Sequence, residues 1–387
     1  MMGKEKRRVP KLRFPGFTED WEQRKFGDLF EYERPDAYIV KSDNYNNDFN
    51  MPVLTANKAF ILGYTNEENS YNKPSIIFDD FTLDRKYVDF PYMLKSSAIK
   101  ILTSKNQHNL RFLFERLNST RFEVLGHARH YISVVQNTTT LCPSVNEEVC
   151  ISNLLTKFDE LITLHQRKLD NLKLKKKALL QKLFPKNGER YPELRFPGFT
   201  DAWEQRKLGD FTNQINAFVN PEDAKLPLWS LTAEAGLIEK TDRYERDFLV
   251  KKKDQFKRIE TNTLVYNPMN ITIGSIDIYT GLYPIAVSGY YVSIVFDKDV
   301  DTDFLKEVLL LPSSLKMYKN YATGSLIERQ RVQYPTFSEL QLLFPNLDEQ
   351  RAIGQLFESL NLNITLHQRK LEHLQLQKKA LLQQMFV

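Results

Sequence analysis

The residue types that could support catalysis or metal binding are sparse in this chain. His127 and His130 lie three residues apart without a third ligand, which argues against a metal site. Asn267-Pro-Met-Asn270 lacks the second proline of the Asn-Pro-Pro-aromatic element expected of an amino-methyltransferase. Pro35-Asp36 and Asp84-Arg-Lys86 fit a nuclease pattern only loosely, and no glycine-rich phosphate loop is present. These patterns favour a chain without catalytic activity and with no metal or cofactor of its own.

The composition bounds the class of protein. With 387 residues, 42% of them apolar and 27% charged, the chain is long enough for two folded domains. Cys142 and Cys150 have no CxxC spacing, so neither a disulfide framework nor a zinc site is supported. The apolar runs are too short to span a membrane, and the basic start leads into no apolar segment. We therefore expect a cytoplasmic location. The net charge of +5 is too small to indicate a nucleic-acid partner by itself.

Two segments of the sequence occur twice. Residues 11–28 recur at 193–210 with 14 of 18 positions identical, and residues 162–182 recur at 364–384 with 16 of 21 identical. Between these repeats lie dissimilar inserts. The chain is therefore a duplicated frame that carries two different inserts.

The second repeat has the period of a long helix with a coiled-coil seam. From Ile151 to Leu183, apolar residues recur in alternating steps of four and three, with polar interruptions at His165 and Lys176. The polar residues either fix the helix register or extend out of a partly open seam. The residues expected to pair the helices are Ile162, His165, Leu169, Leu172, Lys176, Leu179, Ile364, His367, Leu371, Leu374, Lys378 and Leu381.

The order of the repeats predicts an α+β architecture. We expect two α/β domains joined by two long antiparallel coiled-coil helices in a pseudo-two-fold arrangement. In the inserts, residues 75–78, 131–135, 263–266 and 290–296 have strand composition, and helices are expected near 108–120 and 301–320. The expected boundaries are 1–150 for the first domain, 151–186 for the first helix, 187–343 for the second domain and 344–387 for the second helix.

These duplicated motifs resemble a known family. Leu12-Arg-Phe-Pro-Gly-Phe, Trp21-Glu-Gln-Arg-Lys and Ile162-Thr-Leu-His-Gln-Arg-Lys-Leu, each present twice, resemble the specificity subunits of bacterial type I restriction-modification systems. The likeness covers the whole chain and is closest to the subgroup with internal repeats. At the first helix start, Glu148 and Val149 depart from the family pattern, whereas the segment from Pro345 follows it.

The resemblance implies a DNA-reading adaptor. Each domain would be a target-recognition domain for one half of a split, asymmetric site in double-stranded DNA. Two modification (methyltransferase) subunits and the ATP-dependent restriction subunits would dock on the chain, and S-adenosylmethionine, ATP and Mg²⁺ would belong to those partners. Helices of about 35 residues, roughly 50 Å long, could separate half-sites about one DNA turn apart.

Basic residues in the inserts are the candidate DNA contacts. Arginine is the usual reader of guanine, and lysine mostly meets phosphate, so Lys251, Lys252 and Lys253 are expected on phosphate and the arginines on bases. The first-domain candidates are Lys58, Arg85, Lys86, Arg129 and His130. The second-domain candidates are Arg243, Lys251, Lys252, Lys253, Lys257, Arg258, Arg329 and Arg331.

Three other functions remain open at this point. A self-contained methyltransferase or nuclease with a divergent site would bind S-adenosylmethionine or cut DNA alone. A protein-only coiled-coil scaffold would explain the helices but not the two folded inserts. A specificity subunit of a related type II restriction-modification enzyme would share the same sequence features.

Overall fold

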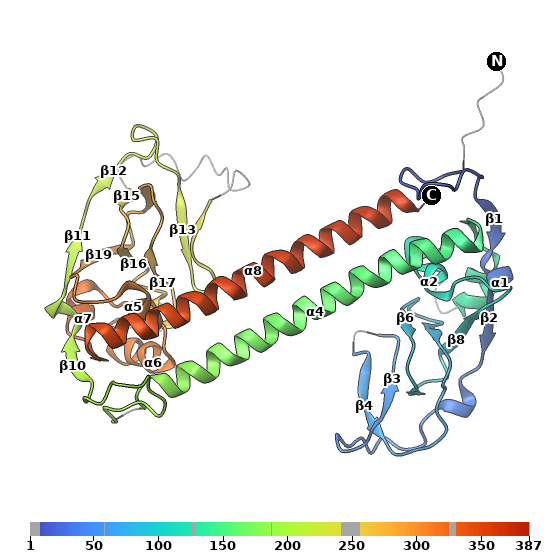
Figure 1. Cartoon of the computed structure of the whole chain (residues 1–387), viewed down its shortest axis with the longest axis horizontal. Coiled ribbons are helices and arrows are strands. Elements are labelled where there is room, and N and C mark those ends of the chain that lie inside the picture. Colours follow the sequence, from blue (N-terminus) through green and yellow to red (C-terminus); the bar gives the residue numbers. More distant parts are fainter. Residues whose placement is uncertain are drawn as a thin grey trace. The chain divides into compact units, whose positions relative to one another are not determined.

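The computed structural model describes residues 8–57, 59–124, 129–186, 188–240, 256–324 and 330–386. The chain divides into two compact units (Figure 1). Unit 1 consists of Met1–His165 with Lys370–Val387, and unit 2 is Gln166–Arg369. Each unit therefore contains one insert and parts of both long helices, whereas the sequence analysis set the helices apart as segments of their own.

Unit 1 is built around a four-stranded antiparallel sheet. Its central strand β5, Ser75–Asp79, is buried along its whole length, as the run Ser-Ile-Ile-Phe predicts. Helix α2, Leu110–Ser119, is capped by the Asn109 side chain, which accepts a hydrogen bond from Phe112 N. The sheet order is β2 (Phe30–Glu33), β8 (Ile99–Ser104), β5 and β6 (Arg85–Val88).

Shorter elements complete unit 1. They are a three-stranded sheet of β4 (Ile61–Thr65), β3 (Met51–Leu54) and β7 (Met93–Leu94); the antiparallel pair β1 (Glu22–Lys25) and β9 (Thr139–Cys142); the short helices α1 (Phe26–Leu29) and α3 (His130–Ser133); and 3-10 turns at Asp36–Tyr38 and Val135–Asn137.

Unit 2 repeats the four-stranded sheet of unit 1 but differs in its smaller sheets. Its four-stranded sheet has the order β11 (Thr212–Ile215), β19 (Val292–Phe296), β16 (Thr263–Tyr266) and β17 (Ile276–Tyr279). The other strands are β12 (Phe218–Val219), β15 (Phe256–Ile259) and β18 (Ile285–Ser288) in one sheet, the hairpin of β13 (Trp229–Thr232) and β14 (Gly236–Glu239), and the pair β10 (Glu204–Lys207) and β20 (Gln341–Phe344). The helices are α5 (Thr302–Leu309), α6 (Pro312–Tyr321) and α7 (Tyr334–Ser338), with 3-10 turns at Leu208–Asp210 and Ile271–Ile273.

The two inserts share a strand order despite their dissimilar sequences. In both four-stranded sheets, the strand after the first repeat lies at one edge, and the strand of that sheet that comes last in the chain, β8 or β19, lies next to it. One predicted strand is wrong, because residues 131–135 form α3 and the start of a 3-10 turn. Their β-branched composition is overridden by local hydrogen bonds, including Val134 N to His130 O.

The predicted long helices are confirmed, with shifted ends. Helix α4 is Val145–Leu183 and helix α8 is Leu347–Met385, each 39 residues long. Both begin near a capping side chain, because Glu147 N donates to Ser144 Oγ and Glu349 N donates to Asn346 Oδ1. The predicted start at 151 was wrong because the apolar seam begins about two turns after the cap. The predicted start at 344 was three residues early.

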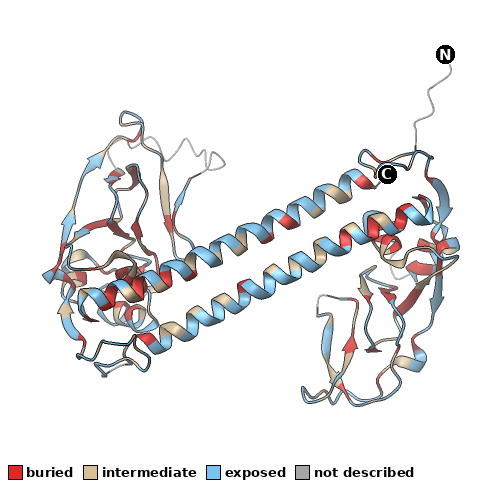
Figure 2. Ribbon diagram, viewed as in Figure 1, coloured by how far each residue is buried: buried red, intermediate tan, exposed pale blue. Residues whose placement is uncertain are grey.

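The apolar seam lies inside both units. All ten seam positions of each helix are buried or half-buried, while most other helix positions are exposed (Figure 2). The unit 1 core includes Ile151 from α4 and Met385 from α8, and the unit 2 core includes Leu183 from α4 and Phe357 from α8. Within each unit, the start of one long helix packs beside the end of the other, so the two helix segments are antiparallel.

Candidate nucleic-acid interface

The first repeat anchors the ends of the long helices. A buried tryptophan from the repeat, a phenylalanine from the insert helix and the phenylalanine after a long helix form a ring cluster in each unit. The rings in each cluster lie 5.5–6.4 Å apart in unit 1 and 5.6–5.8 Å apart in unit 2. The clusters are Trp21, Phe112 and Phe386 in unit 1, and Trp203, Phe304 and Phe184 in unit 2. The repeat therefore joins insert to helix.

A bidentate ion pair accompanies each ring cluster. Arg13 donates to both carboxylate oxygens of Glu147 at 2.8 Å, and this bond raises the pKa of the Arg13 guanidinium. Arg195 makes the same pair with Glu349 at 2.8 and 2.7 Å. Because the glutamates lie in the first turns of α4 and α8, each pair fixes the start of a long helix against the repeat.

The polar seam lysines have partners inside their units. Lys176 Nζ donates to Glu307 Oε1 and Asn361 Oδ1, both at 2.8 Å. Lys378 Nζ donates to Asp159 Oδ1 at 2.6 Å. These lysines are paired within the protein rather than extended into solvent. Their predicted role in helix register stays a prediction, as does that of the half-buried His165 and His367.

In unit 1, a short turn brings several candidate segments together. The 80–84 turn, Asp80–Asp84, connects β5 to β6. Asp80 O accepts hydrogen bonds from His130 N at 3.0 Å and His130 Nδ1 at 2.8 Å, and Asp80 Oδ1 accepts from Tyr131 N at 2.8 Å. Thr82 Oγ1 contacts Asn57 Oδ1 at 3.5 Å. The start of α3 and Asn57 therefore meet at this turn.

Unit 2 has an equivalent turn. The 267–275 turn, Asn267–Ser275, connects β16 to β17, and Pro268 O accepts from Val332 N at 3.0 Å. Arg331 precedes Val332 as Arg129 precedes His130, and both arginines stand at the same distance before their long helix. The Arg331 guanidinium carbon lies 5.6 Å from the Tyr290 ring centroid. The fold thus places Arg129 and Arg331 at matching positions beside matching turns.

The remaining described candidates are dispersed. Arg129 is exposed, and Lys86 is half-buried. Arg85 Nε donates to Asn118 Oδ1 at 2.8 Å, and burial lowers the pKa of its guanidinium. Arg258 is exposed and its Nε pairs with Glu260 Oε1 at 2.6 Å. The candidates outside the described residues are Lys58, Arg243, Lys251, Lys252, Lys253 and Arg329.

Two candidates are corrected by the structure. His130 is fully buried, and its ring is held by Asp80 O, so it does not present a surface for DNA. Lys257 is 4% exposed, and its Nζ donates to Tyr291 O at 2.7 Å. Burial lowers the pKa of the Lys257 ammonium. In both cases a main-chain carbonyl distant in the sequence holds the side chain inside the domain.

Sequence reasoning missed the apolar residues of the two turns. Phe81 is 47% exposed in the 80–84 turn, and Ile273 is 62% exposed in the 267–275 turn. Both were overlooked because only basic and polar residues were considered as DNA contacts. The available signal was Phe81 itself, an aromatic residue between the turn-forming pair Asp79-Asp80 and Thr82.

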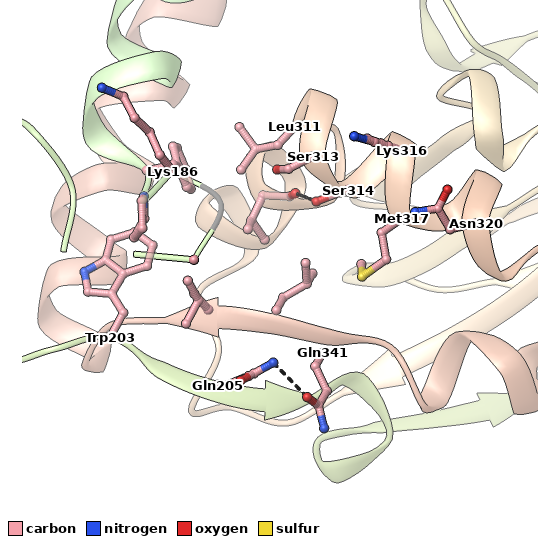
Figure 3. A pocket seen from close by; sticks show the side chains of 16 residues that line it. Lys186, Trp203, Gln205, Leu311, Ser313, Ser314, Lys316, Met317, Asn320 and Gln341 are labelled. Carbon is pink, nitrogen blue, oxygen red and sulfur yellow. Dashed lines mark hydrogen bonds between the residues drawn. The ribbon is translucent and has the colours of Figure 1, made fainter. Parts of the chain in front are cut away.

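A cavity of about 410 Å³ in unit 2 lies beside the end of α4 (Figure 3). Phe184, Trp203 and Met317 line it, and the Gln205–Gln341 hydrogen bond of 2.7 Å lies at one side. The residues that line it include no His, Cys, Asp or Glu, so they offer neither an acid–base pair nor a metal site. The cavity is a hollow in the packing of the α4 end.

Two kinds of site are absent from the residues that the structure describes. There, no group of three or more His, Cys, Asp or Glu side chains is arranged to hold a metal ion. None of the helices described combines the length and apolar character of a membrane span.

Comparison with known proteins gives a family match over part of the chain. The model of the type I restriction modification DNA specificity domain matches residues 18–174. The EcoR124I/EcoR124II specificity subunit of Escherichia coli is 44% identical over 115 residues, which are 28% of this chain and 28% of that protein. The alignment thus spans little more than a quarter of that relative.

One solved structure extends the likeness to the fold of the whole chain. The S subunit of a type I restriction-modification system from M. genitalium has a TM-score of 0.70 at 13% identity, covering 98% of this chain and 99% of that chain. The HsdS subunit from Thermoanaerobacter tengcongensis has a TM-score of 0.40 at 13% identity, covering 97% of each chain. Residues 18–174 thus match the type I restriction modification DNA specificity domain, and the chain as a whole has the fold of the S subunit from M. genitalium.

Proposed function

We propose that this chain is the DNA sequence-specificity subunit of a type I restriction-modification complex. Each insert is a target-recognition domain that reads one half of a split, asymmetric site in double-stranded DNA. The chain itself performs no catalysis. Its partners are two modification subunits and the restriction subunits, which supply the sites for S-adenosylmethionine, ATP and Mg²⁺.

One observation carries this proposal. The same frame is built twice, and it presents an arginine beside a β-turn at the same position in both units, while the neighbouring side chains differ. A duplicated scaffold with two different faces suits two half-sites of different sequence. The protein-only scaffold function explains the helices but leaves the matched turns without a role.

The experiment is to express the chain with its modification subunit in a methylation-free host and to map N6-methyladenine across the genome. We expect a split, asymmetric motif methylated on both strands, and co-purification of the two proteins. A verified stable complex that leaves the genome unmethylated would reject the proposal in favour of the scaffold function. A matched strain that expresses the modification subunit alone is the control, and it should show no such motif.

A further inference from the structure

Three exposed apolar residues of unit 1 lie in the 80–84 turn or on segments that contacts connect to it. Phe81 is 47% exposed, Ile132 is 44% exposed and Tyr32 is 37% exposed. The Tyr32 ring lies 5.3 Å from the ring of buried Tyr131, whose N–H donates to Asp80 Oδ1. Phe81 directly follows Asp80, and Ile132 directly follows Tyr131. Isolated exposed apolar residues are ordinary, but here they flank one hydrogen-bonded junction beside the exposed Arg129.

The turn that carries Phe81 is fixed before any ligand arrives. Asp79 Oδ1 accepts hydrogen bonds from Phe81 N and Thr82 N, both at 2.9 Å. Leu83 N donates to Asp79 O at 3.0 Å, and Asp79 N donates to Asp84 O at 2.8 Å. A backbone held in this way loses little conformational entropy when its side chain makes a contact.

Asp80 connects the turn to the rest of unit 1. Its carboxylate is 1% exposed and lies 3.4 Å from Lys100 Nζ, which compensates the buried charge. Its N–H donates to Ala98 O at 3.0 Å. Together with its bonds to His130 and Tyr131, these contacts join β5, β8 and α3 at one residue. Asp80 therefore sets where Phe81 and Arg129 stand relative to each other.

The chemistry of Phe81 selects its ligand. A phenyl ring forms no hydrogen bond with a phosphate oxygen or a polar base edge. In the major groove, the apolar group that distinguishes one base pair from another is the C5-methyl of thymine, which phenylalanine contacts favourably. Arg129 can meet a guanine edge or a phosphate nearby.

We propose that Phe81 is a specificity-determining residue that contacts a thymine methyl group in the half-site read by the first domain, with Asp80 as its positioning residue. This inference rests on the proposed function. It adds that the half-site contains thymine at the position facing Phe81, and that apolar contact supplies part of the discrimination.

The test combines a base change with a side-chain change. In the complete complex with its modification subunits, binding is measured to duplexes in which each thymine of the mapped site is replaced by uracil, one at a time. Wild type should lose about 3- to 10-fold in affinity at one thymine of one half-site, the loss expected for one methyl contact. The Phe81→Ala variant should bind thymine and uracil at that position equally, and Phe81→Leu should retain part of the preference.

The second half-site supplies the control within the same molecule. Thymine-to-uracil changes there should affect wild type and Phe81→Ala alike, which shows that the variant is folded and assembled. Asp80→Asn should weaken the thymine preference together with first half-site methylation, while second half-site recognition stays unchanged.

Failure of this inference is distinct from failure of the proposed function. A mapped site at which no single thymine-to-uracil change lowers wild-type affinity, or equal uracil effects in wild type and Phe81→Ala, would overturn the role of Phe81 and leave the adaptor function in place. Absence of sequence-specific methylation by a stable complex would overturn both.

Discussion

The starts of α4 and α8 make the same connection with different chemistry. In unit 1, Glu148 Oε2 accepts from Asn109 N at 2.8 Å and its Oε1 contacts His108 Nδ1 at 2.8 Å. In unit 2, Gln350 Oε1 accepts from Asp301 N at 3.0 Å. Asn109 and Asp301 are the N-caps of α2 and α5. In unit 1 the carboxylate is therefore on the long helix and the amide at the cap. In unit 2 the amide is on the long helix and the carboxylate at the cap.

This exchange shows what the duplicated frame requires. Each junction needs an acceptor for the cap N–H and one carboxylate near a helix start, but the carboxylate can come from either helix. Glu148 in unit 1 and Gln350 in unit 2 therefore keep the same junction and differ in which helix holds its carboxyl group. In unit 1 that carboxyl group belongs to a fully buried side chain, and in unit 2 it belongs to the cap.

The largest effect is expected when the end of α4 must take the place of the end of α8 in unit 1. This substitution tests whether the two units are equivalent. Leu183 and Phe184 correspond to Met385 and Phe386, which complete the unit 1 core. We expect fragment 1–186 to form a homodimer in which each α4 end fills the place of α8, measured by analytical ultracentrifugation. Phe184→Ala in the fragment should weaken dimerisation by about 10-fold or more through lost burial. A folded monomeric fragment would contradict this prediction.

Substitution of the seam lysines should have a smaller effect, and the loss in the free energy of unfolding should differ between the two units. Lys176→Met leaves the buried Glu307 with only the Asn361 amide, and we expect a loss of about 2–3 kcal/mol in the free energy of unfolding. Lys378→Met should cost about 1 kcal/mol, because Arg111 still pairs with Asp159 and Glu115. Urea denaturation followed by hydrogen exchange in each unit measures both losses.

The Lys176→Met, Glu307→Gln double variant is the matched control. It removes the unpaired carboxylate and should recover most of the stability lost in the single variant. Equal losses for the two lysine variants would show that Arg111 does not compensate in unit 1.

The smallest expected effect is a difference in pH dependence. Burial raises the pKa of Glu148 above its ordinary value of 4.5, against the opposing hydrogen bonds from Asn109 and His108. The protonated carboxyl is thus favoured in the folded state, so its contribution to stability is present at low pH and is lost as pH rises through the raised pKa. Glu148→Gln should remove this dependence from unit 1.

The measurement is urea unfolding of wild type and Glu148→Gln from pH 4 upward, with hydrogen exchange to resolve the units. Unit 2, which has Gln350 at this position, should respond equally in both proteins. Parallel pH profiles for unit 1 in wild type and variant would rule out the assignment to Glu148.

The long helices could be predicted because their signal is local. A seam such as Ile162, Leu169 and Leu172 repeats along one element, and its burial follows from that period. The shared strand order of the inserts could not be predicted, because β5 and β8 pair across about twenty residues that carry no repeat. Strand pairing depends on non-local contacts that composition does not encode.

The DNA candidates were predicted less well for a related reason. Residue type alone does not distinguish an exposed arginine such as Arg129 from a buried His130 next to it. His130 is buried because Asp80, fifty residues earlier, supplies its acceptor. The equivalence of Arg129 and Arg331 could be suspected from their spacing to the long helices, but the hydrogen-bonded turns that support it are visible only in the fold.

The contribution of α8 to unit 1 has a consequence for synthesis on the ribosome. Unit 1 starts first but needs Met385, whereas unit 2 ends at Arg369. Translating the roughly 200 residues from the α4 end to the α8 end takes about 10–40 s at ordinary rates. During this interval the α4 end of a neighbouring nascent chain competes with the α8 end of the same chain for its place in the core of unit 1. Spacing between ribosomes on one message would therefore affect how much chain assembles correctly.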